Sequence, residues 1–324
     1  MSGILDIGAL QIGHRVQDPF LVCEVDQRSN GDKPYVILTL GNSTGRIGTA
    51  PFWSERVDQV AGIHRGHVVQ VIGEVSEYRD ARQLQVSSIR VLPTDGVNWR
   101  ELLPSVGDVT PLWKWVDEQR ARIAGPRLRN TLALFYDDED FRRNYGECPA
   151  SISGHHAALG GLLKHTIEVA NIARAIARGA RADEDLVLAG VLLHDIGKLE
   201  SYRWNGAFEY TVRGHLYGHV VLGSLLLERR VRDADPVPCT DQELDLLQHL
   251  VLSHHGHLEF GAPVAPMTLE AEVLHFADNA SAKTASMADA LAADAHFTGE
   301  DLVSARLWQL DRRRAYRGKS DWGR

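Results

Sequence analysis

Histidine and aspartate side chains recur at wide spacing through the second half of this 324-residue chain, and eleven of its fifteen histidines lie between residues 155 and 275. Imidazole and carboxylate groups together suit divalent transition metals, and a site with more than four such ligands suggests two ions. Paired ions of this kind are typical of phosphate-ester hydrolysis. The candidate ligands are His165, the adjacent pair His194 and Asp195, His219, the adjacent pair His254 and His255, and Asp278.

Hydrophobic periodicity predicts five helices that would carry these ligands, over residues 159–178, 183–194 and 241–255, with one beginning near residue 214 and a last one reaching Asp278. His165 shares a face with Leu162 and Val169, which is the spacing of a core-facing stripe. A capping-box sequence runs from Thr240 to Glu243. A single inward histidine is more often a hydrogen-bonded core residue than a ligand. Several helices that each end or turn inward at a ligand-type residue favour one shared metal site.

The first 95 residues follow a β pattern instead. Strands are predicted at residues 35–40, 47–53, 68–75 and 84–92, with a helix-like stretch at 54–63. Short strands of this kind suit a small OB-type barrel, whose aromatic and basic side chains can bind single-stranded nucleic acid. The alternative is that these aromatic residues belong to the barrel core. The candidates for a nucleic-acid-binding face are Phe20, Tyr35, Arg46, Phe52, Trp53, Arg79 and Arg82.

Composition limits the class of protein. The formal net charge of −8 argues against binding nucleic acid through bulk positive charge. No apolar run reaches membrane-spanning length, and the first 13 residues lack a secretory signal, so we expect a cytoplasmic protein without membrane contact. Three isolated cysteines fit a reducing compartment. The expected multidomain plan is a barrel over residues 1–95, a linker with leading helices over 96–150, and an all-α metal-binding domain over 151–324. Homo-oligomer formation stays open.

The residues around the ligands resemble a known family. The pattern His165, His194-Asp195, Asp278 resembles the HD superfamily of metal-dependent phosphohydrolases, and the additional histidines resemble its two-metal branch. The flanking sequence is similar to the YhaM-type 3′→5′ exoribonucleases, which join an N-terminal OB-fold to an HD domain. The segments that carry this resemblance are residues 154–157 (GHHA), 161–166 (GLLKHT), 193–198 (LHDIGK), 218–219 (GH), 252–261 (LSHHGHLEFG) and 278–279 (DN).

The resemblance implies release of nucleoside 5′-monophosphates from the 3′ ends of RNA or single-stranded DNA. It also implies two divalent ions with manganese favoured, although these ligand types suit iron, cobalt, nickel and zinc as well. Asp195 is the expected bridge, because a carboxylate can offer one oxygen to each ion. His165, His194 and Asp278 would complete one metal site, and His219, His254 and His255 the other. The paired ions would activate a water that attacks phosphorus.

Two further residues are candidates for catalysis. Lys198 follows Asp195 by three residues and could contact a phosphate oxygen, or it could be a solvated turn residue. His156 could meet the substrate or the leaving oxygen, or be a structural histidine. Two other functions compete with the exonuclease: an HD-type phosphodiesterase for small or cyclic nucleotides with a regulatory barrel, and a nucleic-acid-binding module without catalysis. The last is disfavoured because every expected ligand position is filled.

Overall fold

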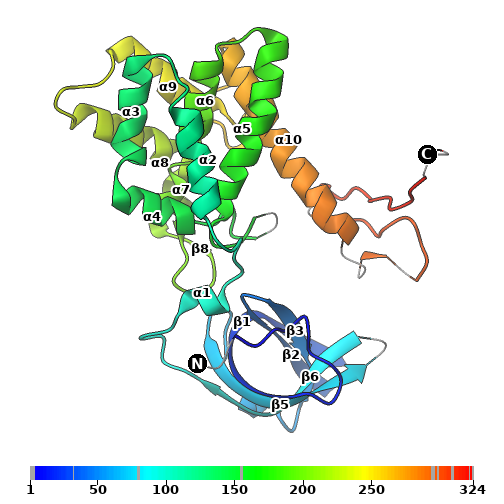
Figure 1. The fold of residues 1–324 in the computed structure, drawn as a ribbon. Coiled ribbons are helices and arrows are strands. Elements are labelled where there is room, and N and C mark those ends of the chain that lie inside the picture. Colours follow the sequence, from blue (N-terminus) through cyan, green and yellow to red (C-terminus); the bar gives the residue numbers. More distant parts are fainter. Residues whose placement is uncertain are drawn as a thin grey trace. The chain divides into compact units, whose positions relative to one another are not determined.

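The computed structural model describes residues 4–31, 33–78, 81–153, 156–292, 296–297, 299–307, 310–320 and 322. The chain divides into two compact units (Figure 1). Unit 1 comprises residues 1–106 and 203–209, and unit 2 comprises residues 107–202 and 210–324. Within the described residues, no helix is long and apolar enough to cross a membrane.

Unit 1 is a closed five-stranded barrel. Strand β1 pairs antiparallel with β2 and β5, β2 with β3, and β5 with β6, and the parallel pairing of β3 with β6 closes the ring. This ring order is that of an OB-type barrel, so the predicted fold of this unit is confirmed. The strands of the ring are β1 (Arg15–Asn30), β2 (Lys33–Asn42), β3 (Gly45–Thr49), β5 (Val68–Tyr78) and β6 (Ala81–Val91). The short strand β4 (Phe52–Trp53) pairs with β2 outside the ring, and helix α1 (Trp99–Leu102) follows β6.

Alternation of apolar and polar residues explains which side chains enter the barrel. On β2, Val36, Leu38 and Leu40 are buried, and the residues between them are half-buried. The predicted strand 47–53 is divided into β3 and β4, which pair with different parts of β2. The predicted helix-like stretch contains only a 3-10 turn, Val57–Gln59. The long strand β1 was not predicted, because Pro19 and a bulge after Val22 interrupt its pattern.

Unit 2 is built of helices, as predicted. All five predicted helices are present, as α5, α6, α8, α9 and α10, and the capping box formed by Thr240 and Glu243 begins α9. The bounds are α2 (Thr110–Arg120), α3 (Pro126–Tyr136), α4 (Glu139–Glu147), α5 (Gly161–Ala180), α6 (Glu184–Leu193), α7 (Lys198–Ser201), α8 (Val212–Arg232), α9 (Asp241–Ser253) and α10 (Leu269–Ala292). A short pairing of β7 (Tyr202–Arg203) with β8 (Glu209–Tyr210) precedes α8.

The centre of unit 2 is the packing of α5 against α6 and α10, with α9 against α8, α6 and α10. Helix α6 is buried on most sides, because residues 189–193 are all inaccessible to solvent. Apolar residues on all faces are expected for a helix that neighbours surround. Because α6 is central, the residues at its C-terminal end lie where the other helices converge.

Candidate metal centre

The first group of ligand-type residues lies at the C-terminal end of α6. His194 and Asp195 follow the last turn of that helix, where they meet His165 of α5 and Asp278 of α10. The His165 Nε2 atom lies 3.0 Å from Asp278 Oδ1 and 3.5 Å from Asp195 Oδ2. The His194 Nε2 atom lies 3.2 Å from Asp195 Oδ2 and 3.4 Å from His165 Nε2. Four potential ligands from three helices therefore face one point.

The second group meets the other oxygen of the same carboxylate. The His219 Nε2 atom lies 3.3 Å from Asp195 Oδ1, and His254 Nε2 lies 3.8 Å from it. His255 completes the group, with its ring centroid 4.3 Å from that of His254 and 5.0 Å from that of His219. Asp195 thus presents Oδ2 to one group and Oδ1 to the other, and all seven predicted ligands lie in one region.

Three atoms of this region are buried without any hydrogen-bond partner: Asp195 Oδ1, His219 Nε2 and His254 Nε2. Buried polar atoms are nearly always satisfied, so three unsatisfied lone-pair atoms that converge require an explanation. Two clusters have donor atoms within 4.8 Å of one another, one of His219, His254 and His255 and one of His165, His194 and Asp195. Cations would satisfy these atoms, and the residues present therefore fit divalent metal binding.

Backbone carbonyls set the tautomer of three of these histidines. The Nδ1 atoms of His194, His254 and His255 each lie 2.7 Å from a carbonyl oxygen, of Val191, Val251 and Phe260 respectively. A carbonyl oxygen only accepts, so each Nδ1 carries a proton, and in the neutral ring each Nε2 keeps its lone pair. Hydrogen bonds of this kind orient metal-binding histidines and raise their basicity as ligands.

Burial keeps two histidines of the second group, His219 and His254, uncharged. It lowers the pKa of His219 to about 3 and holds the pKa of His254 well below its ordinary value. Burial alone would raise the pKa of Asp195, but the ammonium of Lys198 and the ring of His194 outweigh it and hold that pKa well below its ordinary value. At neutral pH His219 and His254 are therefore neutral imidazoles beside an ionised carboxylate, which is the protonation that metal binding needs. Burial alone would lower the pKa of His194, but the carboxylates of Asp195 and Asp278 outweigh it and raise that pKa above its ordinary value.

Lys198 and His156 both lie beside the ligands. The Lys198 Nζ atom donates to Asp195 Oδ2 over 2.5 Å, and only 8% of the residue is exposed, so the alternative of a solvated turn residue is wrong. His156 Nε2 lies 2.7 Å from Glu168 Oε2. Ser281 Oγ donates to the same Glu168 oxygen and lies 3.3 Å from His165 Nδ1. His156 is therefore linked to His165 through Glu168 and Ser281.

Glu168 and Ser281 are not among the site residues predicted from the sequence. Glu168 lies three residues after His165 on α5, a spacing that places it on the same side of the helix. That spacing was a usable signal. Ser281 had none, because only the packing of α10 against α5 brings it to His165.

The family comparison agrees with this geometry. The model of the HD domain family matches residues 162–283, which include all seven ligand-type residues. A protein named 3′-5′ exoribonuclease YhaM from Bacillus subtilis (strain 168) is 31% identical over 87% of this chain and 89% of its own length. A protein of the same name from Halalkalibacterium halodurans is 31% identical over 95% of this chain and 94% of its own length. This chain belongs to the YhaM family.

Among solved structures, the second OB-fold domain of replication protein A from Methanococcus maripaludis matches with a TM-score of 0.23 and 20% identity. The match covers 27% of this chain and 93% of that domain. The relatives named YhaM extend over most of the chain, so the family likeness includes both the barrel and the helical unit.

Two glycines of this YhaM-family chain allow α8 to approach the turn after α6. A Cβ atom on Gly197 would lie 2.0 Å from the backbone oxygen of His219 and 2.3 Å from the backbone nitrogen of Gly223. Gly218 has φ 70° and ψ 160°, which interrupts the helical conformation of α8 immediately before His219. Contact of backbone with backbone at Gly197, and the break at Gly218, place His219 opposite Asp195.

Two residues of the predicted nucleic-acid face, Tyr35 and Trp53, lie side by side on the barrel. Tyr35 and Trp53 are paired across β2 and β4, half-buried, with ring centroids 4.8 Å apart. Arg28 is the β1 partner of Tyr35 and was missed, because β1 itself was missed. Arg46 is exposed on β3, at the other end of β2. Single-stranded bases could stack on the Tyr35–Trp53 pair.

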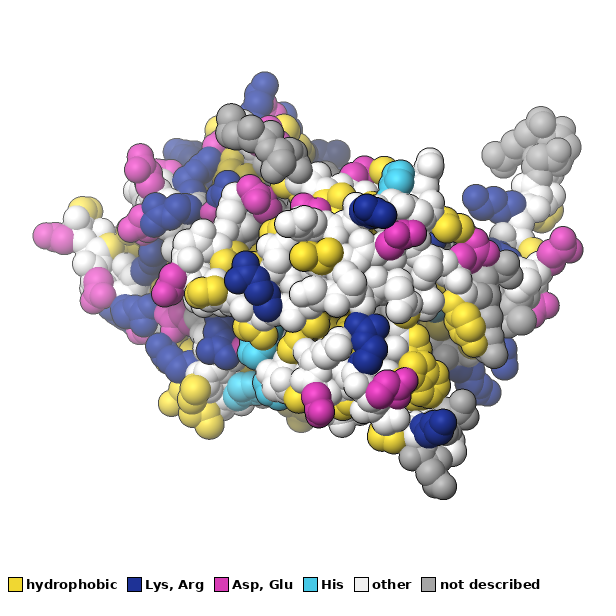
Figure 2. All heavy atoms as spheres, turned by 90° about the horizontal axis from the view of Figure 1, so that it is seen from below, with side chains coloured by type: hydrophobic (Ala, Val, Ile, Leu, Met, Phe, Trp, Pro, Cys, Tyr) yellow, Lys and Arg dark blue, Asp and Glu magenta, His cyan; other side chains and the backbone are white. Residues whose placement is uncertain are grey.

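Two of the other candidates do not belong to such a face, and a third is exposed but partly engaged within the barrel. Phe20 and Phe52 are 0% and 2% exposed in the barrel core, so their prediction as surface residues is wrong: alternation turns both inward. Arg82 Nη1 donates to the carbonyl oxygens of Gly8 and Leu10, so Arg82 secures the segment before β1. Arg79 lies outside the described residues. On the face shown in Figure 2, lysine and arginine side chains stand singly or in small groups among acidic ones.

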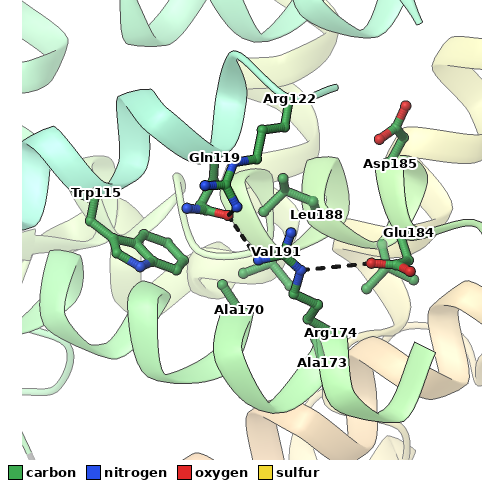
Figure 3. A pocket seen from close by; sticks show the side chains of 11 residues that line it. Trp115, Gln119, Arg122, Ala170, Ala173, Arg174, Glu184, Asp185, Leu188 and Val191 are labelled. Carbon is green, nitrogen blue, oxygen red and sulfur yellow. Dashed lines mark hydrogen bonds and ion pairs between the residues drawn. The ribbon is translucent and has the colours of Figure 1, made fainter. Parts of the chain in front are cut away.

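A cavity of about 250 Å³ lies between α2, α5 and α6 (Figure 3). Trp115 forms one wall, and Arg174 Nη1 donates to Gln119 Oε1 over 3.0 Å at its centre. None of the seven ligand-type residues lines it. The metal centre is therefore defined by its converging ligand atoms and not by this cavity.

Proposed function

We propose that this protein is a 3′→5′ exoribonuclease that uses two divalent metal ions, with Mn²⁺ as the favoured ion. The substrate class is single-stranded RNA, and single-stranded DNA is a second substrate to test. The observation that carries the proposal is Asp195, which directs one carboxylate oxygen to each of two histidine clusters. Membership of the YhaM family supports degradation in the 3′→5′ direction.

His165, His194 and Asp278 would hold one ion together with Asp195 Oδ2. The cluster of histidines on the other side, with Asp195 Oδ1, would hold the second. Bound ions of this kind lower the pKa of a water molecule and offset negative charge on the phosphate. Lys198 keeps Asp195 ionised and aligned through its 2.5 Å contact.

We assign His156 a place beside the scissile phosphate. Its Nε2 atom is held by Glu168, which fixes the ring while leaving it next to His165, with ring centroids 6.4 Å apart. In this position His156 would orient substrate, and Glu168 would hold the proton at His156 Nε2.

The direct test uses a 5′-labelled single-stranded RNA with Mn²⁺. We expect a ladder shortened from the 3′ end, nucleoside 5′-monophosphates as products, and full arrest when a chelator removes the metal. A parallel reaction with single-stranded DNA of the same sequence tests whether DNA is also hydrolysed. An intact RNA together with hydrolysis of a cyclic dinucleotide would instead establish the small-nucleotide phosphodiesterase.

A second prediction concerns the barrel. The double variant Tyr35→Ala/Trp53→Ala removes a stacking platform, and each stacked base contributes about 1–3 kcal/mol. We therefore expect KM for a long RNA to rise at least about fivefold, while kcat/KM for a dinucleotide, which needs only the metal centre, stays unchanged. Steady-state kinetics on both substrates check this. An equal loss on both would mean that the barrel does not bind the strand.

A further inference from the structure

The charged C-terminal residues are mainly basic, although the chain as a whole is acidic. The described residues 303–307 and 310–320, called the basic segment below, contain six basic residues and one acidic residue, in a chain of net charge −8. Such a local excess is the electrostatic footprint of a polyanion-binding surface. Its basic residues are Arg306, Arg312, Arg313, Arg314, Arg317 and Lys319.

The basic segment is folded against α10. Leu307, Leu310 and Ala315 form a small core with Ala290 and Phe297, and Met287 and Leu291 of α10 pack against it. Isolated bridges join Val303 to Tyr316 and Leu307 to Arg313. The Lys283 ammonium lies 2.6 Å from the carboxylate of Asp311. The segment therefore presents its charges from a packed structure.

Its turn presents an arginine at some conformational cost. Asp311 and Arg312 have φ of 53° and 61°, a left-handed conformation that glycine or asparagine adopts more easily. Arg306, Arg312 and Lys319 are exposed and form no ion pair within the described part of the chain. By contrast, Arg314 and Arg317 donate to backbone carbonyls. Three cations thus remain available to a partner.

An aromatic side chain accompanies these cations. Tyr316 is 63% exposed between Arg314 and Arg317, and Trp322, shortly after the segment, is 84% exposed. Basic residues bind the phosphates of single strands, and exposed aromatic rings stack on their bases.

Helix α10 connects the segment to the metal centre. Asp278 belongs to the first ligand group, and Lys283, which holds Asp311, follows five residues later. Five residues correspond to about 7.5 Å along a helix and a rotation of roughly 140°. A strand that leaves the ligands and winds partway around α10 would therefore meet the segment within a few nucleotides.

We propose that the basic segment binds single-stranded RNA a few nucleotides upstream of the 3′ end that enters the metal centre. This inference rests on the proposed exoribonuclease function. Phosphates contact Arg306, Arg312 and Lys319, and Tyr316 stacks on a base. The segment holds long substrates and takes no part in hydrolysis.

The test compares two charge reversals of equal size on the full chain. Arg306→Glu/Arg312→Glu alters the segment, and Lys114→Glu/Arg181→Glu alters two exposed cations elsewhere on unit 2. Binding of a 20-nucleotide labelled RNA is measured without metal at several salt concentrations. Turnover of a dinucleotide with Mn²⁺ is measured separately.

We expect the segment variant to bind the RNA at least about tenfold more weakly and to lose about 1.4 from its salt slope, because each single-strand phosphate contact contributes about 0.7. Its dinucleotide turnover and the RNA binding of the control variant should match wild type. Equal binding by both variants, a loss without a change of slope, or binding of phosphatidylserine vesicles in place of RNA overturns the proposal. Absence of RNA degradation by wild type overturns the proposed function alone, because the binding measurement does not need turnover.

Discussion

An Asp195→Asn variant is expected to lose more than about 100-fold in turnover and to bind fewer than two ions. Removing a hydrogen-bond partner of a metal ligand already costs about 10–100-fold in affinity or activity. Asp195 is itself the candidate ligand, and it faces both histidine groups. Asparagine keeps the size of the side chain and removes the charge that would attract both cations.

The same substitution also leaves Lys198 without its buried partner. Breaking a buried ion pair destabilises a protein by about 3–5 kcal/mol, so a loss of activity could reflect unfolding. The double variant Asp195→Asn/Lys198→Met removes both charges and should recover most of the melting temperature without recovering activity. Metal content, melting temperature and RNA turnover are measured together, with Asp233→Asn as an exposed control. Full activity with two ions bound would contradict the shared-ligand scheme.

A Gly197→Ala variant should be destabilised by at least about 3 kcal/mol. The added methyl group would meet backbone atoms at 2.0 Å and 2.3 Å, and backbone cannot move aside as a flexible side chain can. Overpacking of a close contact typically costs 1–3 kcal/mol, and this contact is closer than most. The backbone of Gly197 has φ −68°, which alanine also adopts, so the cost arises from contact alone. Displacement of α8 would move His219 away from Asp195 and reduce metal binding.

Gly179→Ala is the matched control. Gly179 lies near the end of α5, and no atom outside its own helix lies within 4 Å of the added Cβ position. Alanine in a helix is more favourable than glycine by up to about 1 kcal/mol, so this variant should be unchanged or slightly more stable. Urea unfolding of both variants and of wild type checks the pair. Equal stability of Gly197→Ala and the control would show that α8 can shift without loss of folding stability, and would contradict the prediction.

Much of the metal centre could be predicted because its signals are local. His165 lies in an apolar stripe with a helical period, and the capping box of Thr240 and Glu243 marks the start of α9 within four residues. Periodicity of this kind depends on neighbours three and four positions apart, so it can be recognised in a single sequence. In the barrel the local pattern was less informative. Pro19 and a bulge interrupt the alternation of β1, so that strand was not predicted, and Phe52 was predicted on the surface although it is buried.

By itself, the sequence determined which residues could bind metal, which helices carry them, and which family the pattern resembles. Only the tertiary structure decided that Asp195 directs each oxygen to a different histidine cluster and that Ser281 joins His165 to Glu168. It also decided that the C-terminal cations are presented from a segment packed on α10. These features depend on contacts between residues tens of positions apart in the chain. Such contacts follow from how helices pack around a shared core, and no local period records them.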